Sequence, residues 1–173
     1  MDNATQRLLF DVTVCTCAVL TLFALLIHEA VAGSHAYTAT NDKWKAECSS
    51  CHIAYPPQLL TGADWQRLMG GLDNHFGENA VLDPKDNKDI LDFLKRHAGY
   101  GAKHSASSLR ISDTAWFVSE HDEVSSKAWT DPAVKSRANC TACHINAERG
   151  DWSERGVRMP AGLGGEDDDD DED

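Results

Sequence analysis

Two cysteine pairs, each followed directly by a histidine, are the residues of this sequence best suited to chemistry. The two motifs are Cys48-Ser49-Ser50-Cys51-His52 and Cys140-Thr141-Ala142-Cys143-His144. Two thiols three residues apart on one helical turn can form thioether bonds with the two vinyl groups of one porphyrin. The adjacent histidine then lies under the iron as an axial ligand. Two copies of this motif predict two covalently bound haem c groups.

Other uses of the cysteines fit the spacing less well. A zinc site built from two cysteine pairs usually has about 15 to 20 residues between the pairs, whereas 88 residues lie between Cys51 and Cys140. A thioredoxin-like dithiol needs a βαβ context, which the sequence lacks. Structural disulfides would not explain a histidine after each pair. The haem interpretation is therefore the favoured one.

An electron carrier usually closes both axial positions of its iron, so each haem needs a second ligand. His75 follows Trp65, Leu68 and Leu72 at three- and four-residue steps, on the apolar side of a predicted helix. His121 shares a face with Phe117 and Val124 in the same way. His75 lies 23 residues after His52, and His121 lies 23 residues before His144. We predict the pairs His52/His75 and His144/His121, with crossed pairing as the variant.

Other side chains are weaker candidates for the sixth ligand. His97 ends a helix predicted to begin at Asp83-Pro84, where the helix dipole favours a histidine for structural reasons. His104 lies in the Gly- and Ser-rich stretch 99–108, which is typical of a linker. Met159 is an alternative ligand for the second haem. It lies only fifteen residues after His144.

The elements that must position these residues are helices. Apolar periodicity and capping signals predict helices near 42–52, 62–76, 84–97, 113–124 and 132–144, with Thr61 and Ser112 as N-caps and with almost no strand pattern. We therefore expect an all-α chain with two small haem-binding domains, residues 33–100 and 101–162. Domains of this size are normally marginal, so the haems are expected to complete their cores. The aromatic residues expected near the haems, or in ordinary helix contacts, are Trp44, Tyr55, Trp65, Phe76, Trp116, Phe117 and Trp129.

The N-terminal 32 residues resemble a secretory signal. Residues 12–27 are largely apolar but short for a membrane span of about 20 residues, and Ala30-Val31-Ala32 is a small-x-small cleavage pattern. Cleavage would remove Cys15 and Cys17. The rival is an uncleaved anchor that tethers the chain to the membrane through residues 8–27. Export agrees with the haem motifs, because bacteria attach c-type haem outside the cytoplasm, so we expect a periplasmic protein.

The net charge of −12 is concentrated at the C-terminus. The run 166–173 carries −8 and residues 1–32 carry −2, so only −2 remains for the body of the chain. An acidic chain is a poor partner for nucleic acid. We expect residues 163–173 to form a solvated acidic tail. In the alternative interpretation the tail is a docking element, whose negative charge would attract a basic partner.

The residues assembled above resemble the bacterial dihaem cytochrome c family. The likeness runs over the segments 47–57, 71–80, 116–121 and 138–144, within a span from about 44 to 160. The resemblance implies a periplasmic electron-transfer protein with two bis-histidine haems, of which the first lies in a domain similar to class I cytochrome c. It also implies a membrane b-type cytochrome that supplies electrons from quinol, and a small c-type cytochrome as a redox partner.

Two functional classes follow from these expectations. The first is an electron carrier, which is not an enzyme. The alternative is a sensory, gas-binding or peroxide-reducing haem protein in which one sixth ligand is labile. Binding of CO to the ferrous protein discriminates between the two, because a closed iron has no free position for a gas.

Overall fold

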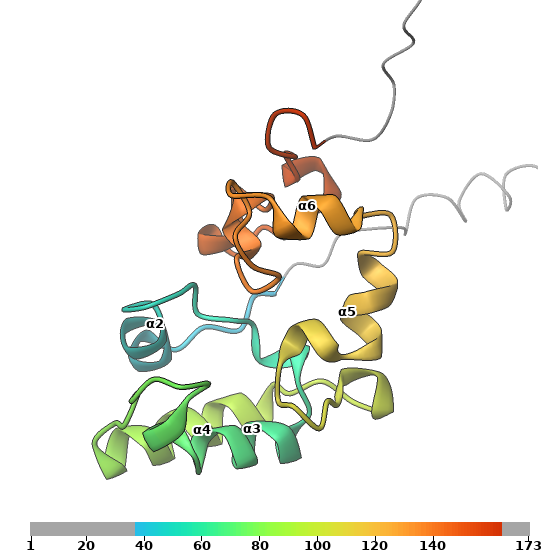
Figure 1. Cartoon of the computed structure of the whole chain (residues 1–173). Coiled ribbons are helices and arrows are strands. Elements are labelled where there is room, and N and C mark those ends of the chain that lie inside the picture. Colours follow the sequence, from blue (N-terminus) through green and yellow to red (C-terminus); the bar gives the residue numbers. More distant parts are fainter. Residues whose placement is uncertain (1–36, 164–173) are drawn as a thin grey trace, which may run out of the picture. The chain divides into compact units, whose positions relative to one another are not determined.

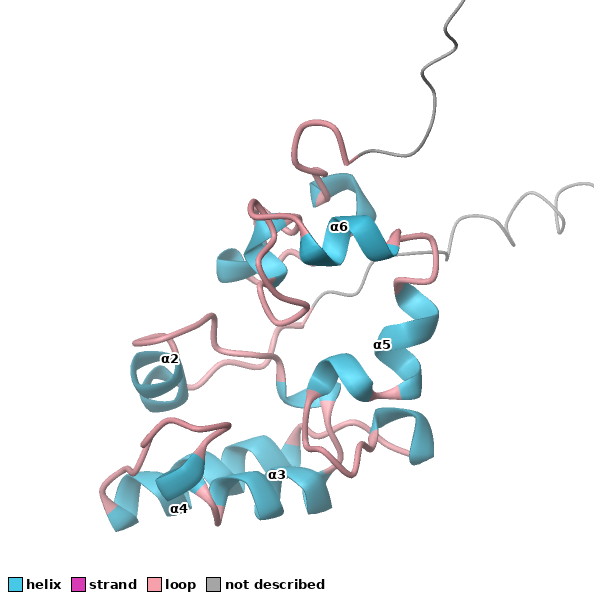
Figure 2. Ribbon diagram, in the orientation of Figure 1, coloured by secondary structure: helices cyan, strands magenta, loops and turns pink. Residues whose placement is uncertain are grey.

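The computed structural model describes residues 37–163, and within them the chain consists of short helices joined by loops (Figure 1). The α-helices are α2 (Asp42–Cys48), α3 (Gly62–Met69), α4 (Pro84–Arg96), α5 (Ala115–Glu120) and α6 (Ser126–Thr130). Single 3₁₀ turns occur at η2 (Pro57–Leu59), η3 (Leu72–Asn74), η4 (Ala102–His104), η5 (Ile111–Asp113), η6 (Cys140–Ala142), η7 (Ala147–Arg149) and η8 (Glu154–Gly156). Figure 2 shows no strand in the described part, which confirms the all-α prediction.

Side-chain caps define where the helices begin. The Thr61 hydroxyl accepts a hydrogen bond from the Asp64 amide, as predicted for α3. The predicted cap at Ser112 is wrong, because Ser112 lies inside η5 and the Thr114 hydroxyl caps α5 by accepting from the Phe117 amide. Helix α5 therefore starts two residues later than the sequence pattern indicated.

Helices α2, α3 and α5 are shorter than predicted, with α2 ending at Cys48 and α5 at Glu120. Helix α3 ends at Met69 rather than near residue 76, because Gly70 and Gly71 follow and disfavour helix continuation. The predicted helix 132–144 is wrong. The Asp131 carboxylate accepts from the Ala133 amide, and Lys135 adopts a φ of +68°, so the chain turns there. Only η6 remains helical in the second motif.

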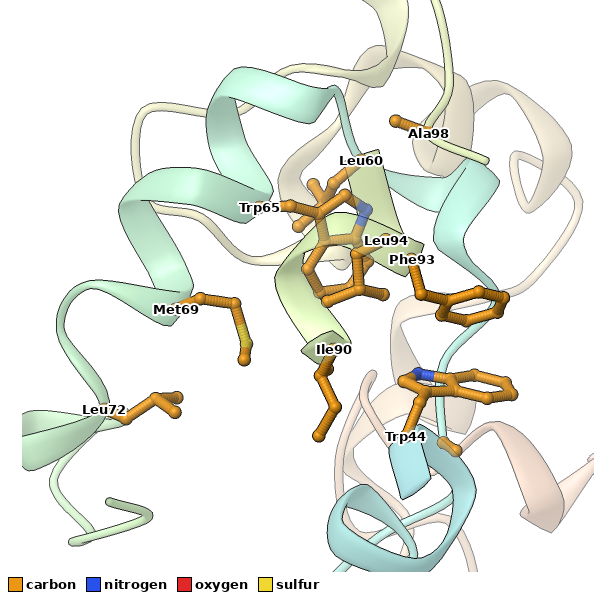
Figure 3. Packing of buried hydrophobic residues seen from close by; sticks show 10 residues of the cluster. Trp44, Leu60, Trp65, Met69, Leu72, Ile90, Phe93, Leu94 and Ala98 are labelled. Carbon is orange, nitrogen blue, oxygen red and sulfur yellow. The ribbon is translucent and has the colours of Figure 1, made fainter. Parts of the chain in front are cut away.

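The hydrophobic core lies where α3 and α4 pack together (Figure 3). Its buried members are Trp44, Ala54, Leu60, Trp65, Met69, Leu72, Ile90, Phe93, Leu94 and Ala98. Trp44 brings α2 against α4, with its ring 5.3 Å from that of Phe93. The Trp65 indole donates to the Pro57 carbonyl at 2.7 Å. Residues 44–98 thus form a core of their own.

Gly99 is a position where the packing tolerates no side chain. Its amide donates to the Leu60 carbonyl, and an added Cβ would overlap the Gln58 carbonyl oxygen and lie 2.9 Å from Cγ of His104. We expect Gly99→Ala to lower the free energy of unfolding by about 3 kcal/mol, the upper end for overpacking. Denaturant unfolding followed by circular dichroism measures this loss.

Gly62→Ala is the matched control for Gly99→Ala. A Cβ at Gly62 meets Ala98 and Lys95 only at 3.8 Å, which is ordinary contact, and Gly62 lies in a helix. The control should leave stability unchanged or raise it by up to about 1 kcal/mol. Equal stability of Gly99→Ala and the parent would contradict the described packing.

The buried Asp64 carboxylate accepts hydrogen bonds from three side chains. Burial by itself raises the pKa of Asp64, but hydrogen bonds from Arg67 at 2.5 Å, from Thr61 at 2.7 Å and from Ser105 outweigh burial and lower it. The carboxylate therefore stabilises the fold above the pKa of an unfolded aspartate, about 4. That contribution is lost as the pH falls through the lowered native pKa.

We expect Asp64→Asn to reduce the free energy of unfolding by about 2 kcal/mol at pH 7, as for other hydrogen bonds to charged groups. The difference from the parent should hold down to pH 5 and narrow below pH about 4. Denaturant titrations at pH 7, 5 and 3 test both statements. A difference that grows on acidification would show that the sign of the pKa shift is wrong.

The predicted signal or anchor (1–32) and the acidic tail from residue 164 onward lie outside the described residues. The division into two haem domains near residue 100 stays a prediction. Within residues 37–163, no helix combines the length and the apolar character needed to cross a membrane.

Candidate functional site

The first Cys-x-x-Cys-His motif lies at the C-terminal end of α2. Cys48 is the last residue of the helix and is half-buried, whereas Cys51 and His52 are exposed in the turn that follows. Burial raises the pKa of the Cys48 thiol to about 11. His52 places Nδ1 2.7 Å from the Ile53 carbonyl. With the proton on Nδ1, this bond leaves Nε2 free to bind a metal.

The second motif is held by η6 and by the segment that follows η8. Burial raises the pKa of the Cys140 thiol to about 11. His144 forms an isolated antiparallel bridge with Val157, and the Arg158 amide donates to the Cys143 carbonyl at 2.8 Å. The Trp152 ring lies 5.4 Å from the His144 ring. The Nδ1 of His144 is buried without a hydrogen-bond partner.

His75 is positioned by a tight turn rather than by a helix. It caps η3 and exchanges backbone hydrogen bonds with Glu78, at 2.7 Å and 3.1 Å. Phe76 and Gly77 between them have φ values of +56° and +106°. Phe76 is thus a non-glycine residue in the left-handed region, which is uncommon for a bulky side chain. The prediction that His75 lies on a helical stripe is wrong, because the helix ends at Met69.

His121 lies at the C-cap of α5, so it too is at a helix end rather than inside a helix. Its Nδ1 lies 2.9 Å from the Phe117 carbonyl, one turn earlier, and its ring stacks on Phe117 with centroids 4.1 Å apart. The Trp129 ring lies 5.8 Å away on another side. These contacts fix the direction in which Nε2 points.

The structure brings together the four predicted histidines in two pairs. The ring centroids of His52 and His75 are 6.1 Å apart, with their planes at 26°. Those of His121 and His144 are also 6.1 Å apart, with their planes at 71°. Among the ring contacts of residues 37–163, the crossed pairs His52 with His121 and His144 with His75 are absent. Met159, the alternative to His121 as second ligand of the second haem, is half-buried two residues beyond Val157.

The spacing of the pairs fits a metal ion held between two imidazoles. Bonds of about 2 Å from each ring nitrogen to a shared ion would separate the ring centroids by about 6 Å. Burial lowers the pKa of His75, His121 and His144, which favours the neutral imidazole that a metal requires. Within residues 37–163, no group of three or more His, Cys, Asp or Glu side chains could hold a metal ion by itself. Each histidine pair with its two thiols has the donor set of a covalently attached haem.

Six of the seven aromatic residues expected near the haems divide into two groups. Tyr55, Phe76, Phe117 and Trp129 contact the paired histidines, whereas Trp44 and Trp65 belong to the helical core. Trp116 stacks on His104 at 5.6 Å. His104 is therefore packed into the fold and not part of an open linker. His97 caps the end of α4, as predicted.

Two residues beside the site were not found from the sequence. The Arg110 guanidinium lies 4.3 Å from the centre of the Phe76 ring and is close enough to His75 to help lower its pKa, after burial and His52. Trp152 packs against His144. Neither residue belongs to a motif or an apolar period, so no sequence signal could have found them.

Comparisons with known proteins relate this arrangement to a family. The family model of dihaem cytochrome c matches residues 44–152, a range that contains both motifs and all four paired histidines. Two structures of diheme cytochrome c (DHC) from Rhodobacter sphaeroides share 41% and 40% identity with the chain, at TM-scores of 0.58 and 0.59. Each match covers 65% of this chain and 97% of the other.

A diheme cytochrome type c from Shewanella baltica OS155 is similar as well. It shares 38% identity at a TM-score of 0.61, and the match covers 70% of this chain and 94% of that one. No curated protein matches the chain.

Proposed function

The chain belongs to the dihaem cytochrome c family and is an electron-transfer protein with two covalently bound c-type haems, and we propose that it relays electrons in the periplasm. In this proposal the donor is a membrane b-type cytochrome that oxidises quinol, and the acceptor is a soluble haem protein or reductase. The signal-like residues 1–32 support export.

The observation that carries the proposal is the matched spacing of 6.1 Å in both histidine pairs. Two protein ligands on each iron leave no position for a substrate, which favours outer-sphere electron transfer over catalysis. A bound haem would supply the one-electron chemistry. We infer bis-histidine ligation by His52 with His75 and by His144 with His121.

Backbone carbonyls and aromatic rings of the chain orient the histidine ligands and affect how strongly they donate to a metal. The carbonyl oxygens of Ile53 and Phe117 accept the Nδ1 protons of His52 and His121, which fixes the tautomer and makes each imidazole a better donor. Two nitrogen ligands poise an iron at a lower potential than a methionine and a histidine do. The Tyr55 ring stacks on His52 and the Phe117 ring stacks on His121, so that one face of each imidazole is shielded from solvent.

A redox titration followed in the near infrared tests the proposal, together with a ferrous-CO spectrum of the native protein. We expect two one-electron steps, no band from methionine sulfur, and no rapid CO binding. Stoichiometric CO binding would favour the gas-binding or peroxide-reducing alternative. A sulfur band would assign Met159 to the second haem.

The two sites should differ in their electron paramagnetic resonance (EPR) spectra, because their imidazole planes meet at 26° and 71°. Near-parallel planes split the iron d orbitals more strongly than near-perpendicular planes do. We expect the ferric protein to give one rhombic low-spin signal from the first site. The second site should give one more anisotropic signal with a larger maximal g value. Two identical rhombic signals would contradict the angle between His121 and His144.

A further inference from the structure

Tyr55 contacts both haem-attachment segments of the chain. Its ring stacks on the His52 ring, with centroids 4.6 Å apart and planes at 20°. Its hydroxyl donates to the Ala138 carbonyl at 2.6 Å, across 83 residues of sequence. Ala138 lies two residues before Cys140. One side chain thus lies against the proximal histidine of the first motif and holds the backbone that enters the second.

The Ala138 carbonyl is close to the attachment chemistry of the second motif. The Cys140 thiol also approaches this oxygen, at 3.7 Å. Burial, and after it the neighbouring Cys140, raise the pKa of Tyr55, in agreement with a hydroxyl that lies beside the second motif. The Asn139 side chain bonds back to the Val134 carbonyl at 2.9 Å. The Tyr55 hydroxyl therefore donates its hydrogen bond to a loop that is stabilised by a hydrogen bond of its own.

The backbone of Tyr55 is held rigidly from its other side. Pro56 and Pro57 follow it, and both are buried. Their rings restrict the backbone, including that of the residue before each proline. The Pro57 carbonyl accepts from the Trp65 indole at 2.7 Å, inside the α3 and α4 core. Tyr55 is thus a stiff connection between this core and the loop before Cys140.

We propose that Tyr55 is a positioning residue that holds the two haem sites at one separation, so that electron exchange between the haems depends on it. This inference rests on the proposed function. Electron tunnelling falls steeply with distance, so a loop that moves relative to His52 slows the exchange. Tyr55 acts through His52 and through the Ala138 carbonyl and needs no contact with a substrate.

Tyr55→Phe in the full-length, haem-loaded protein removes the hydroxyl and keeps the stacked ring. Tyr100→Phe is the matched control, because that ring is 84% exposed. Pulsed EPR measures the distribution of distances between the two ferric irons, and flash photoreduction measures the rate of exchange between the haems. We expect Tyr55→Phe to broaden the distribution and slow the exchange severalfold, because the loop before Cys140 loses its hydrogen bond to position 55 and tunnelling falls steeply with distance. The control should change neither.

Two further variants separate positioning from folding. A 4-aminophenylalanine at position 55 keeps a donor in the same place and should restore the parent distribution and rate, even if Tyr55→Phe loads haem poorly. Tyr55→Leu removes the ring and should change the g values of the first haem alone, because only His52 loses its stacking partner.

Parent-like distances and rates in Tyr55→Phe would overturn the inference, as would a 4-aminophenylalanine variant that exchanges no faster than Tyr55→Phe. Failure of the proposed function is distinguishable. It would appear in the parent protein itself, as CO binding or as the absence of two low-spin haems.

Discussion

Replacing His121 with alanine is expected to convert one of the two low-spin haems to a high-spin, five-coordinate form. His121 is the imidazole that lies 6.1 Å from His144, and its Nδ1 is held by the Phe117 carbonyl. Removal of the ring leaves a gap beside Phe117 and Trp129 that a gas molecule can enter. The variant should bind one CO per chain and raise the potential of that haem by about 0.1 V, a modest part of the range that axial ligands span.

Absorption, EPR and CO titration of the variant measure these changes. His75→Ala is the reciprocal variant and should alter only the rhombic signal of the first site. His97→Ala is the control, because His97 caps α4 and its ring packs on Phe93 at 5.1 Å. A His121→Ala protein that keeps two low-spin haems without a sulfur band would contradict the assignment. The same protein with a sulfur band would show that Met159 can replace the imidazole.

Removing the attachment thiols should affect the two parts of the chain unequally. We expect Cys140→Ala with Cys143→Ala to leave one haem and to unfold the surrounding region. Among the described residues from 115 onward, the buried apolar side chains are only Phe117, Ala128, Val134 and Ala147. So few residues cannot form an independent core. The second haem must therefore supply most of the apolar surface against which this region packs.

The reciprocal pair, Cys48→Ala with Cys51→Ala, should leave α3 and α4 folded, because their core contains ten buried residues of its own. A pyridine haemochrome assay should count one haem in each double variant. Hydrogen exchange followed by mass spectrometry should then show loss of protection over about residues 125–158 only when the second motif is removed. Retained protection there would contradict the dependence on haem.

The cofactor and the family were predictable from the sequence because covalent haem attachment requires fixed neighbours along the chain. The thiols and the proximal histidine must be adjacent in sequence, so Cys48 to His52 is readable as a motif. The family match and its solved structures confirm the predicted family, the all-α class and the two haems. The predicted cap at Thr61 and the predicted helix start at Asp83-Pro84 also match the structure, since helix initiation is largely a local property.

The local structure around the distal histidines was harder to predict from the sequence. His75 and His121 were chosen for helical periodicity, yet both lie where a helix or 3₁₀ turn ends. Periodicity indicates which side of a segment is apolar but does not show where backbone hydrogen bonding stops. Gly70 and Gly71 were a visible sign for α3. The turn at Lys135 had no comparable sign, because a positive φ is uncommon for lysine and no glycine marks the position.

The turn that carries His75 has a consequence for how this ligand can vary in evolution. The Leu72 carbonyl accepts from the Ala80 amide at 2.8 Å, outside the His75 and Glu78 pair. Residues 72–80 therefore form a closed turn that is held by its own backbone hydrogen bonds. Insertions or deletions between this turn and Asp83 would change the length of the loop before α4 without moving the backbone of His75. The position of His75 is thus independent of the length of the loop that follows it, whereas the position of His121 depends on the length of α5.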